Sequence, residues 1–537
     1  MSLRTALRAT PGLLALSLIL AGGVPAVAQV SVTTYHNDNY RTGWNSAETV
    51  LTPTAVHSSS FGVLKTVVLD DQVDAQPLVV PGVNITAGAF KGIHTVVYVA
   101  TDNNTIYAVD TTSGQVLLSP NFGPPVVKPL GCGQKTPDVG INSTPVIDLS
   151  SNTLYAVVYN QQATGPAYFV HALDLGSLTD KVPPQPVTAS HTLTDGTTFT
   201  FNAKYQRQRP ALLLANGNVY AAFGSFCDFA PNLSRGWVLG WQTGSLTPLG
   251  GNQITDSQAT DADDFFLSSV WMSGYGPAAD DSGNILFVTG NSDPSGTTYD
   301  GVTDIQESVV KVSADLTTLL DLFTPSNVAN MDAHDQDFGS GGVLVLPDQP
   351  GSIPHLAVAT GKLGSMFFMN EDNLGGFSTL TNNVLGTYTV GGCWCGASYF
   401  VDKDKAARVV SSGGRSIQVW KLLTSPSPAL TKVSSSAAFN PVTSGFFTSV
   451  SSNGSANPII WALTRPTQAQ STVSLYAFAP DIGGTTMKQL FTGTAGAWPA
   501  NGTNTNLVPV VANGEVFVAS YKELMILGLK AKGKAKK

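Results

Sequence analysis

The most constraining feature of this sequence is a short block that recurs eight times. Each block is a proline or a pair of small residues, and it introduces a short apolar run, a turn and a second apolar run. The intervals between successive blocks run from 51 to 68 residues, with a mean of roughly 62. A unit of this size cannot bury both of its faces alone, so the repetition indicates a solenoid or a propeller. The blocks are centred on Pro77, Pro145, Pro210, Pro277, Gly342, Ala397, Pro458 and Pro509.

The first unit shows the expected structure of one repeat. Short apolar or alternating segments are separated by turns at residues 102–104 and 113–114. Strand, turn, strand, turn is typical of a four-stranded antiparallel meander, and no long segment has helical spacing. The four predicted strands cover residues 77–80, 94–100, 105–110 and 115–118.

The last unit is one strand short. Residues 507–511, 516–520 and 524–527 form three predicted strands, and the chain then ends. Residues 62–69 form a further apolar strand just before the first block, and we expect it to pair with the last blade. Such pairing would close the ring and remove exposed sheet edges. The predicted fold is therefore all-β: an eight-bladed β-propeller of four-stranded antiparallel blades, closed by an N-terminal strand, in a single domain over residues 29–528.

The first 28 residues have the pattern of a signal peptide. Arg4 and Arg8 precede an apolar stretch at residues 13–21, and a small-x-small cleavage site ends at Ala28. We expect a secreted or periplasmic protein. No later segment has 18 uncharged apolar residues, so no transmembrane segment is predicted. The lysine-rich end, residues 529–537, is interpreted as a basic, disordered tail.

Composition and charge indicate which kinds of molecule this chain could bind. Only 12% of residues are charged, while 53 glycines and 32 prolines are typical of a turn-rich β protein. The formal net charge is −8, and the lysines of the tail leave the body still more acidic. An acidic body repels nucleic acid, so no nucleic-acid partner is expected. We expect a monomer that binds a protein or carbohydrate ligand at the propeller face.

The first unit resembles a known repeat. Residues 98–102, 106–110 and 112–114 are similar to the repeat of the PQQ-like (quinoprotein alcohol dehydrogenase-like) β-propeller superfamily, and the chain resembles its exported bacterial branch. Ala108, Asp110, Ser113 and Gly114 match the repeat's A-x-D-x-x-(T/S)-G core, whereas Leu118 stands where a docking tryptophan is expected. The superfamily includes quinone enzymes and cofactor-free scaffolds, so the resemblance implies the fold and leaves the activity open.

Unusual side chains gather in two kinds of segment. In each blade, the segment leading into the inner strand and the turn between the second and third strands emerge on one face. We therefore expect a polar, concave mouth at the ring axis. The residues in these segments are Asp74, Gln76, Asp102, Cys132, Asn142, Arg207, Arg209, Cys227, Asp228, Trp271, Asn291, Asp293, residues 332–337, Lys362 and residues 393–395.

The trio Cys393-Trp394-Cys395 bears on a cofactor. In the quinone enzymes of the superfamily that this chain resembles, PQQ is held between a tryptophan and a ring of two adjacent cysteines. Here Trp394 separates the two cysteines. A bridge between Cys393 and Cys395 would be strained. We therefore expect two structural disulfides that join this pair to Cys132 and Cys227, with a redox role or free thiols as alternatives. If PQQ binds, Trp394, Arg209 and Lys362 are the candidate cofactor-binding residues.

A second cluster bears on metal binding. Asp332, His334, Asp335 and Asp337 place three carboxylates and an imidazole within six residues. Carboxylates suit calcium, and a histidine with aspartates suits a transition metal. The alternative is a solvated acidic loop. Three further acids are interpreted as surface residues: Asp261, Asp263 and Asp264.

Three functions remain open at this point. The leading interpretation is an exported, non-catalytic propeller that acts as a binding or scaffold protein through one face. The first alternative is a PQQ- and calcium-dependent dehydrogenase of alcohols or sugars, and the second is a polysaccharide lyase or hydrolase. The sequence has no G-x-S-x-G motif, no Walker loop and no dinucleotide-binding glycine fingerprint. No catalytic residue is assigned.

Overall fold

The computed structural model describes most of the chain. The described residues are 29–132, 137–259, 265–292, 299–439, 444–464, 472–480, 484–498 and 507–531. The predicted signal peptide and most of the basic tail lie outside them. So do Asp261, Asp263, Asp264 and Asp293.

Four antiparallel blades fill the first part of the chain, and each runs outward from its inner strand. Blade 1 is β3 (Leu78–Ile85), β4 (Gly92–Ala100), β5 (Ile106–Asp110) and β6 (Val116–Leu118). Blade 2 is β9 (Val146–Asp148), β10 (Thr153–Gln162), β11 (Gly165–Asp174) and β12 (Gln185–Pro186). Blade 3 is β16 (Leu213–Ala215) with β15 (Gln206–Gln208), then β17 (Asn218–Ser225), β18 (Trp237–Gln242) and β19 (Gln253–Ile254). Blade 4 is β20 (Ala278–Ala279), β21 (Ile285–Val288), β22 (Val309–Val312) and β23 (Leu319–Thr324), with β27 (Gly376–Phe377) added at its outer edge.

Four more blades complete the ring. Blade 5 is β24 (Val343–Leu346), β25 (Leu356–Thr360), β26 (Ser365–Asn370) and β28 (Gly386–Thr389). Blade 6 is β29 (Ser398–Val401), β30 (Ala407–Ser411), β31 (Gln418–Leu423) and β32 (Ala429–Ser435). Blade 7 is β33 (Phe447–Asn453), β34 (Ala456–Leu463), β35 (Thr472–Ala479) and β36 (Lys488–Ala497), and β1 (Trp44–Asn45) runs parallel to β33. Blade 8 is β37 (Val510–Ala512), β38 (Glu515–Ala519), β39 (Tyr521–Leu529) and β2 (Phe61–Gln72).

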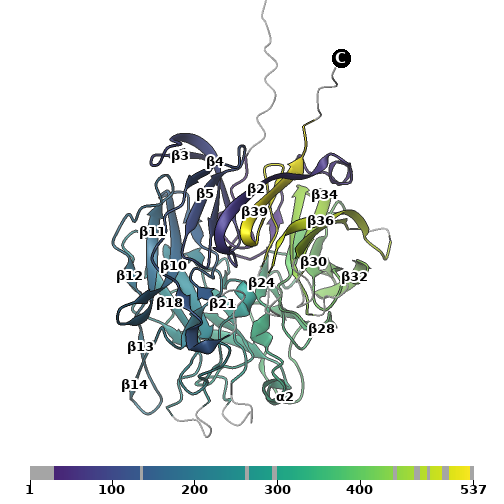
Figure 1. Ribbon diagram of the computed structural model, residues 1–537. Coiled ribbons are helices and arrows are strands. Elements are labelled where there is room, and N and C mark those ends of the chain that lie inside the picture. The colour runs from purple at the N-terminus through teal and green to yellow at the C-terminus, as the bar shows by residue number, and fades with distance from the viewer. Residues whose placement is uncertain are drawn as a thin grey trace, which may run out of the picture.

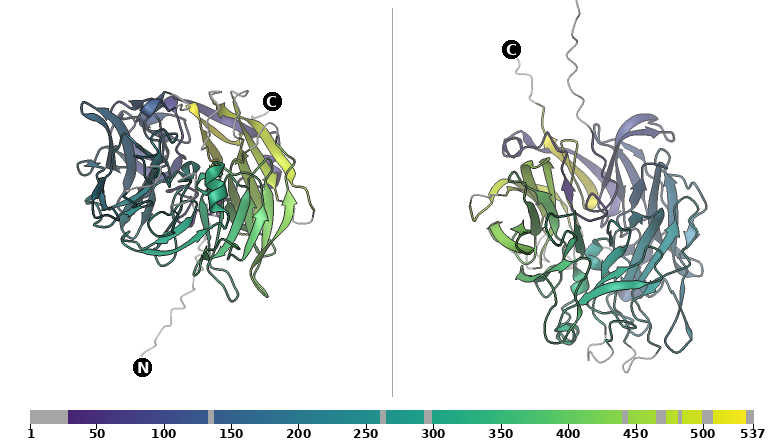
Figure 2. Two further views of the ribbon diagram at one scale, coloured as in Figure 1. Left: turned by 90° about the horizontal axis from the view of Figure 1, so that it is seen from below. Right: turned by 180° about the vertical axis from the view of Figure 1, so that it is seen from behind.

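The N-terminal strand closes the ring, as predicted. β2 pairs antiparallel with β39, with Phe61 opposite Leu529 and Val67 opposite Leu524. In Figure 1 the purple β2 lies beside the yellow β39, and Figure 2 shows from two other directions that the colours run round the ring in chain order. The prediction of an eight-bladed, all-β propeller is confirmed.

The repeat motif of blade 1 stabilises the turn between β5 and β6. The Asp110 carboxylate accepts hydrogen bonds from the backbone N–H and the hydroxyl of Ser113, at 2.6 and 2.7 Å. Gly114 follows at a φ of +76°, which a side chain would disfavour, and its N–H donates to the Asp110 carbonyl. The residues that resemble the superfamily repeat therefore fix the turn from β5 to β6.

An N-terminal segment occupies the axis of the ring. Residues 32–46, here called the axial segment, make hydrogen bonds to all eight blades. The backbone of this segment bonds to six inner strands, and the side chains of Arg41 and Asn45 reach blades 3 and 8. These bonds satisfy backbone groups that the ring would otherwise leave unpaired around its axis. The contacted residues are Val79, Ile147, Leu212, Ala279, Val345, Tyr399, Val450 and Val511.

Arg41 anchors the axial segment. Its side chain is fully buried, and its guanidinium donates to the carbonyls of Leu212 at 3.1 Å and Pro277 at 2.9 Å. It also donates to the Tyr35 carbonyl at 2.9 Å. Tyr275 completes the junction, because its hydroxyl donates to the Arg41 carbonyl at 2.9 Å. One arginine thus links the inner strands of blades 3 and 4 to the axis.

One repeat marker was misplaced. Pro458 was predicted to precede an inner strand, but it lies within β34, the second strand of blade 7. The inner strand is the serine-rich β33, which has no apolar run to reveal it. Its hydroxyls are satisfied by neighbouring strands: Ser449 donates to the Pro509 carbonyl at 2.7 Å, and Ser451 accepts from the Trp461 indole at 2.9 Å.

Helical structure is scarce in the described part of the chain. The two α-helices are α1 (Pro53–Val56) and α2 (Val328–Ala333), and short 3-10 turns include η2 (Met272–Gly274). Within these residues, no helix is both long and apolar enough to cross a bilayer.

Candidate functional site

Four successive blades line one cavity. Its volume is about 190 Å³, and it lies where the segments leading into the inner strands meet the middle turns of blades 3 to 6. Arg209, Lys362 and Trp394, predicted from sequence to share a binding site, all line it. The full lining is Arg207, Arg209, Ser225, Cys227, Asp228, Trp271, Asp335, Asp337, Lys362 and Trp394.

A series of side-chain hydrogen bonds holds Arg207 in place. It lies in β15, and its guanidinium donates to the Asn142 side-chain oxygen, at 3.1 Å from Nη2. The Asn142 amide in turn donates to the Asp102 carboxylate at 2.6 Å. Burial lowers the pKa of Arg207, and the charges of Asp74 and Asp102 oppose that effect. Residues from the mouth segments of blades 1, 2 and 3 therefore meet, as the strand order predicted.

Two tryptophans and two cations form the middle of the cavity wall. The Arg209 guanidinium lies over the Trp271 ring, 5.2 Å from its centre. The Lys362 ammonium lies 5.6 Å from the centre of the Trp271 ring and 5.8 Å from that of Trp394. These distances fall within the range of cation–π attraction. The cations and rings thus support each other along one side of the cavity.

Lys362 bridges two carboxylates. It sits in the turn from β25 to β26, and its Nζ donates to Asp335 Oδ1 at 2.6 Å and to Asp337 Oδ2. The backbone N–H of Asn291 donates to the other oxygen of Asp337 at 2.9 Å. Burial alone would raise the pKa of Asp337, but Lys362 holds it below its ordinary value. Burial would lower the pKa of Lys362, but Asp337 and Asp335 raise it.

A second acidic wall comes from the turn between β17 and β18. Cys227 and Asp228 both have positive φ, at 52° and 54°, and a disulfide ties Cys227 to Cys132 of the preceding repeat. The Ser225 hydroxyl donates to the Asp228 carboxylate. Desolvation raises the pKa of Asp228, and the nearby charges of Asp337 and Asp335 add to the effect. A crosslinked turn therefore presents this carboxyl to the cavity.

The four residues predicted as metal ligands do not gather around one point. Asp332 is buried and accepts from the Ser292 N–H at 3.2 Å and the Gln306 amide at 2.9 Å. His334 is exposed and bonds through Nδ1 to the Asn330 carbonyl. Asp335 and Asp337 are taken by Lys362. In the described parts of the chain, no three histidine, cysteine or carboxylate side chains form a group that could hold a metal ion. The short loop after α2 separates these side chains.

Sequence reasoning missed one acid beside this cluster. Glu307 is fully buried at a φ of +49°, and its Oε2 accepts from the Phe338 N–H. Its Oε1 has no hydrogen-bond partner. Burial, followed by the charges of Asp337 and Asp332, raises the pKa of Glu307 well above its ordinary value. Glu307 lies just before β22, between the second and third strands of blade 4, so the strand-order rule could have identified it.

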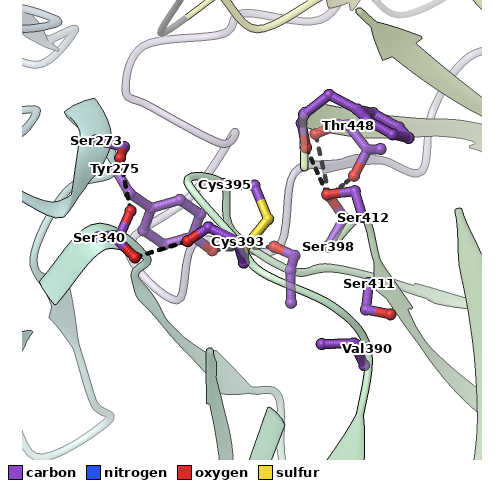
Figure 3. Close-up of a disulfide and its surroundings, with 12 residues drawn as sticks. Ser273, Tyr275, Ser340, Val390, Cys393, Cys395, Ser398, Ser411, Ser412 and Thr448 are labelled. Carbon is purple, nitrogen blue, oxygen red and sulfur yellow. Dashed lines mark hydrogen bonds between the residues drawn. A yellow bond between two sulfur atoms is a disulfide. The ribbon is translucent and has the colours of Figure 1, made fainter. Parts of the chain in front are cut away.

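The disulfide pairing differs from the expected one. Cys393 bonds to Cys395, and Cys132 bonds to Cys227 over a separation of 95 residues. The predicted links between the two pairs are therefore wrong. The reason is local geometry: the segment at 393–395 brings both sulfurs to the same buried side. Figure 3 shows this bond, with the Ser340 hydroxyl donating to the Cys393 carbonyl at 2.7 Å.

A second cavity has a different character. It measures about 210 Å³ and lies between β18 and the segment before β13 (Ser190–Thr192), and no charged side chain lines it. Its lining includes Trp241, Gly250 and Asn252. A third, smaller cavity of about 70 Å³ is charged and is lined by residues that include Asp280, Lys311 and Glu371. The side chains that the sequence predicted to share a binding site line the cavity of blades 3 to 6.

Comparison with known proteins supports the fold. No family model matches this sequence, and no curated protein matches it. Among solved structures, a quinohemoprotein alcohol dehydrogenase from Comamonas testosteroni is 12% identical with a TM-score of 0.61, over 95% of this chain and 82% of its own. A quinohemoprotein alcohol dehydrogenase from Pseudomonas putida HK5 is 14% identical with a TM-score of 0.57, over 94% and 81% of the two chains. A europium-containing methanol dehydrogenase is 10% identical with a TM-score of 0.59, over 93% and 98%. At these identities the likeness concerns the fold alone, and it confirms the resemblance to the PQQ-like propellers at that level.

Proposed function

We propose that this chain is an exported, non-catalytic propeller that binds a saccharide in the cavity of blades 3 to 6. The observation that carries the proposal is the composition of that cavity. Its walls combine the two rings of Trp271 and Trp394 with three cationic and three acidic side chains. Aromatic rings pack against the apolar faces of sugar rings, and charged groups orient hydroxyls by strong hydrogen bonds.

The charge balance favours a neutral ligand. Three cations, Arg207, Arg209 and Lys362, stand against three acids, Asp228, Asp335 and Asp337. A hydroxyl both donates and accepts, so a polyol can use donors and acceptors on the same wall. The volume is below the range usual for drug-sized ligands, which suits one sugar ring at the end of a chain.

The test is direct binding of defined sugars. Maltose, cellobiose and N,N′-diacetylchitobiose are titrated into the protein by calorimetry and by saturation-transfer NMR. We expect one of them to bind, and we expect Trp271→Ala to weaken that binding about tenfold or more, because the stacking face is lost. Absence of binding by all three, or binding that Trp271→Ala leaves unchanged, would contradict the proposal.

A PQQ- and calcium-dependent dehydrogenase is the second candidate, because the three solved structures described above are quinohemoprotein alcohol dehydrogenases and a methanol dehydrogenase. The residues present do not fit this pair of groups. Calcium needs six to eight oxygen ligands, whereas Asp335 and Asp337 are engaged by Lys362. PQQ is a tricarboxylate, and the acids of the cavity leave no surplus positive charge for it. The sulfurs of Cys393 and Cys395 are buried and do not line the cavity.

The two candidates are separated by a reconstitution assay. PQQ and millimolar calcium are added to the protein, and dye reduction is followed with ethanol, glycerol and glucose. We expect no turnover and no change in melting temperature. Dye reduction that disappears in Trp394→Ala would establish the dehydrogenase instead.

A further inference from the structure

The segment that carries Trp394 is unusual in its burial pattern. Cys393 and Cys395 are both fully buried, whereas Trp394 between them is half-buried and lines the cavity. The disulfide therefore points into the protein while the indole points into the cavity. A bond that closes across three residues leaves the middle one little backbone freedom.

Backbone hydrogen bonds fix the same segment on both sides. The Cys393 N–H donates to the Gly361 carbonyl at 3.0 Å, and the Trp394 N–H donates to the Ser444 carbonyl at 2.9 Å. The Ser340 hydroxyl donates to the Cys393 carbonyl at 2.7 Å (Figure 3). It also lies 2.9 Å from the Asp337 carbonyl oxygen, so the two carbonyls share its one proton. Through Cys393, the segment is tied to the turn of Lys362 on one side and to Asp337 on the other.

Two glycines allow this close approach. A Cβ at Gly445 would lie 3.0 Å from the Cys395 sulfur, and Gly445 also has a φ of +77°. A Cβ at Gly364 would lie 2.8 Å from the backbone of Gly391, where φ at Gly364 is +83°. A side chain at Gly445 would displace the disulfide, and one at Gly364 would push the residues before Cys393 away from the Lys362 turn.

We propose that the Cys393–Cys395 disulfide is a positioning device for the binding cavity, which holds Trp394 in the orientation that the bound sugar requires. The inference rests on the proposed saccharide-binding function. A free tryptophan would have to be ordered when the sugar binds, and that ordering weakens affinity. A wall fixed in advance avoids this loss, so the bond acts on binding through Trp394 rather than by touching the sugar.

A double-mutant cycle tests the proposal. The probe is the tightest-binding of maltose, cellobiose and N,N′-diacetylchitobiose. Cys393→Ala with Cys395→Ala is expected to weaken binding about tenfold when Trp394 is present, and less than twofold in the Trp394→Ala background. An equal loss in both backgrounds, or no loss with Trp394 present, would overturn the proposal.

Removal of the other disulfide is the matched control. Cys132→Ala with Cys227→Ala loosens a different wall, so its effect on binding should be the same with and without Trp394. Dependence on Trp394 here as well would show general loosening of the cavity and would overturn the specific role of Cys393–Cys395.

A second measurement does not need a ligand. Acrylamide quenching of Trp394 is obtained as the difference between the protein and its Trp394→Phe variant. The quenching constant should rise at least twofold when Cys393 and Cys395 become alanine, with unchanged circular dichroism. An unchanged constant would overturn the positioning role. If no disaccharide binds, the proposed function fails, while this measurement still decides whether the bond orders Trp394.

Discussion

At the residue scale, Lys362 carries the charge balance of the cavity. Its ammonium bridges Asp335 and Asp337, and Asp337 is almost fully buried. Substitution Lys362→Met leaves that buried carboxylate without a cation, which costs about 3 kcal/mol of stability. Guanidinium unfolding of the two proteins measures the difference.

Lys421→Met is the control for this substitution. Lys421 pairs with Asp404 at 3.0 Å, but both side chains are more than a third exposed. Solvent screens such a pair, so the loss should stay below about 1 kcal/mol. Equal losses of stability in Lys362→Met and Lys421→Met would show that the buried ion pair of Lys362 contributes no more than an exposed one.

Glu307 makes stability depend on pH in a defined direction. Its folded-state pKa is raised by burial and by Asp337 and Asp332. The unfolded chain therefore releases this proton at a lower pH than the folded protein, so stability falls as pH rises above about 4.3, the ordinary glutamate pKa. Glu307→Gln removes this pH-dependent loss of stability and keeps a side-chain oxygen that can accept from the Phe338 N–H.

We expect the Glu307→Gln variant and the parent to have similar melting temperatures at pH 4. The variant should melt higher by about 2 °C or more at pH 8. Thermal scans between pH 4 and pH 8 measure the gap. A gap that stays constant or narrows with pH would mean that Glu307 holds no excess proton in the folded state.

At the element scale, the axial segment does more than connect the N-terminus to β2. It makes hydrogen bonds to all eight blades, six of them through its backbone, and Arg41 is its most heavily bonded residue. Arg41→Ala leaves buried carbonyls of blades 3 and 4 without donors, at a cost of about 3 kcal/mol. Chemical denaturation checks this value.

Arg415→Ala provides the comparison for Arg41. Arg415 is exposed and makes a long hydrogen bond of 3.4 Å to the Phe439 carbonyl. Its loss should stay within about 0.5 to 1 kcal/mol. If Arg41→Ala is no more costly than Arg415→Ala, the axial segment contributes little to the stability of the ring.

At the scale of the whole molecule, closure depends on residues from opposite ends of the chain. β2 supplies the outer strand of blade 8, which otherwise contains three strands. Deletion of residues 29–72 removes this strand and the axial segment together, and exposes the edge of β39. We expect aggregation on refolding, because an open edge templates pairing between molecules. Light scattering measures it, with deletion of residues 532–537 as the control. A truncated protein that stays monomeric with an unchanged melting temperature would refute closure.

The sequence by itself determined the fold class of this protein. The repeat period and turn residues such as Asp110 and Gly114 are local features of single blades, and the apolar strand at 62–69 is the one strand that the last blade lacks. Strand order also placed Arg209, Lys362 and Trp394 on one face, because alternate connections of a meander emerge on the same side. Blade 7 escaped this reasoning, since the serines of β33 are buried by neighbouring strands rather than by their own hydrophobicity.

Only the tertiary structure decided the chemistry of the site. Which cysteine bonds to which depends on where each sulfur points, so proximity on one face could not distinguish Cys393–Cys395 from links to Cys132 and Cys227. The acids at residues 332–337 share a short stretch of sequence, yet Lys362, in the next turn of the same blade, engages Asp335 and Asp337 but not Asp332. The axial segment shows the same principle, because its hydrogen bonds to all eight blades depend on the closed ring and leave no periodic pattern in residues 32–46.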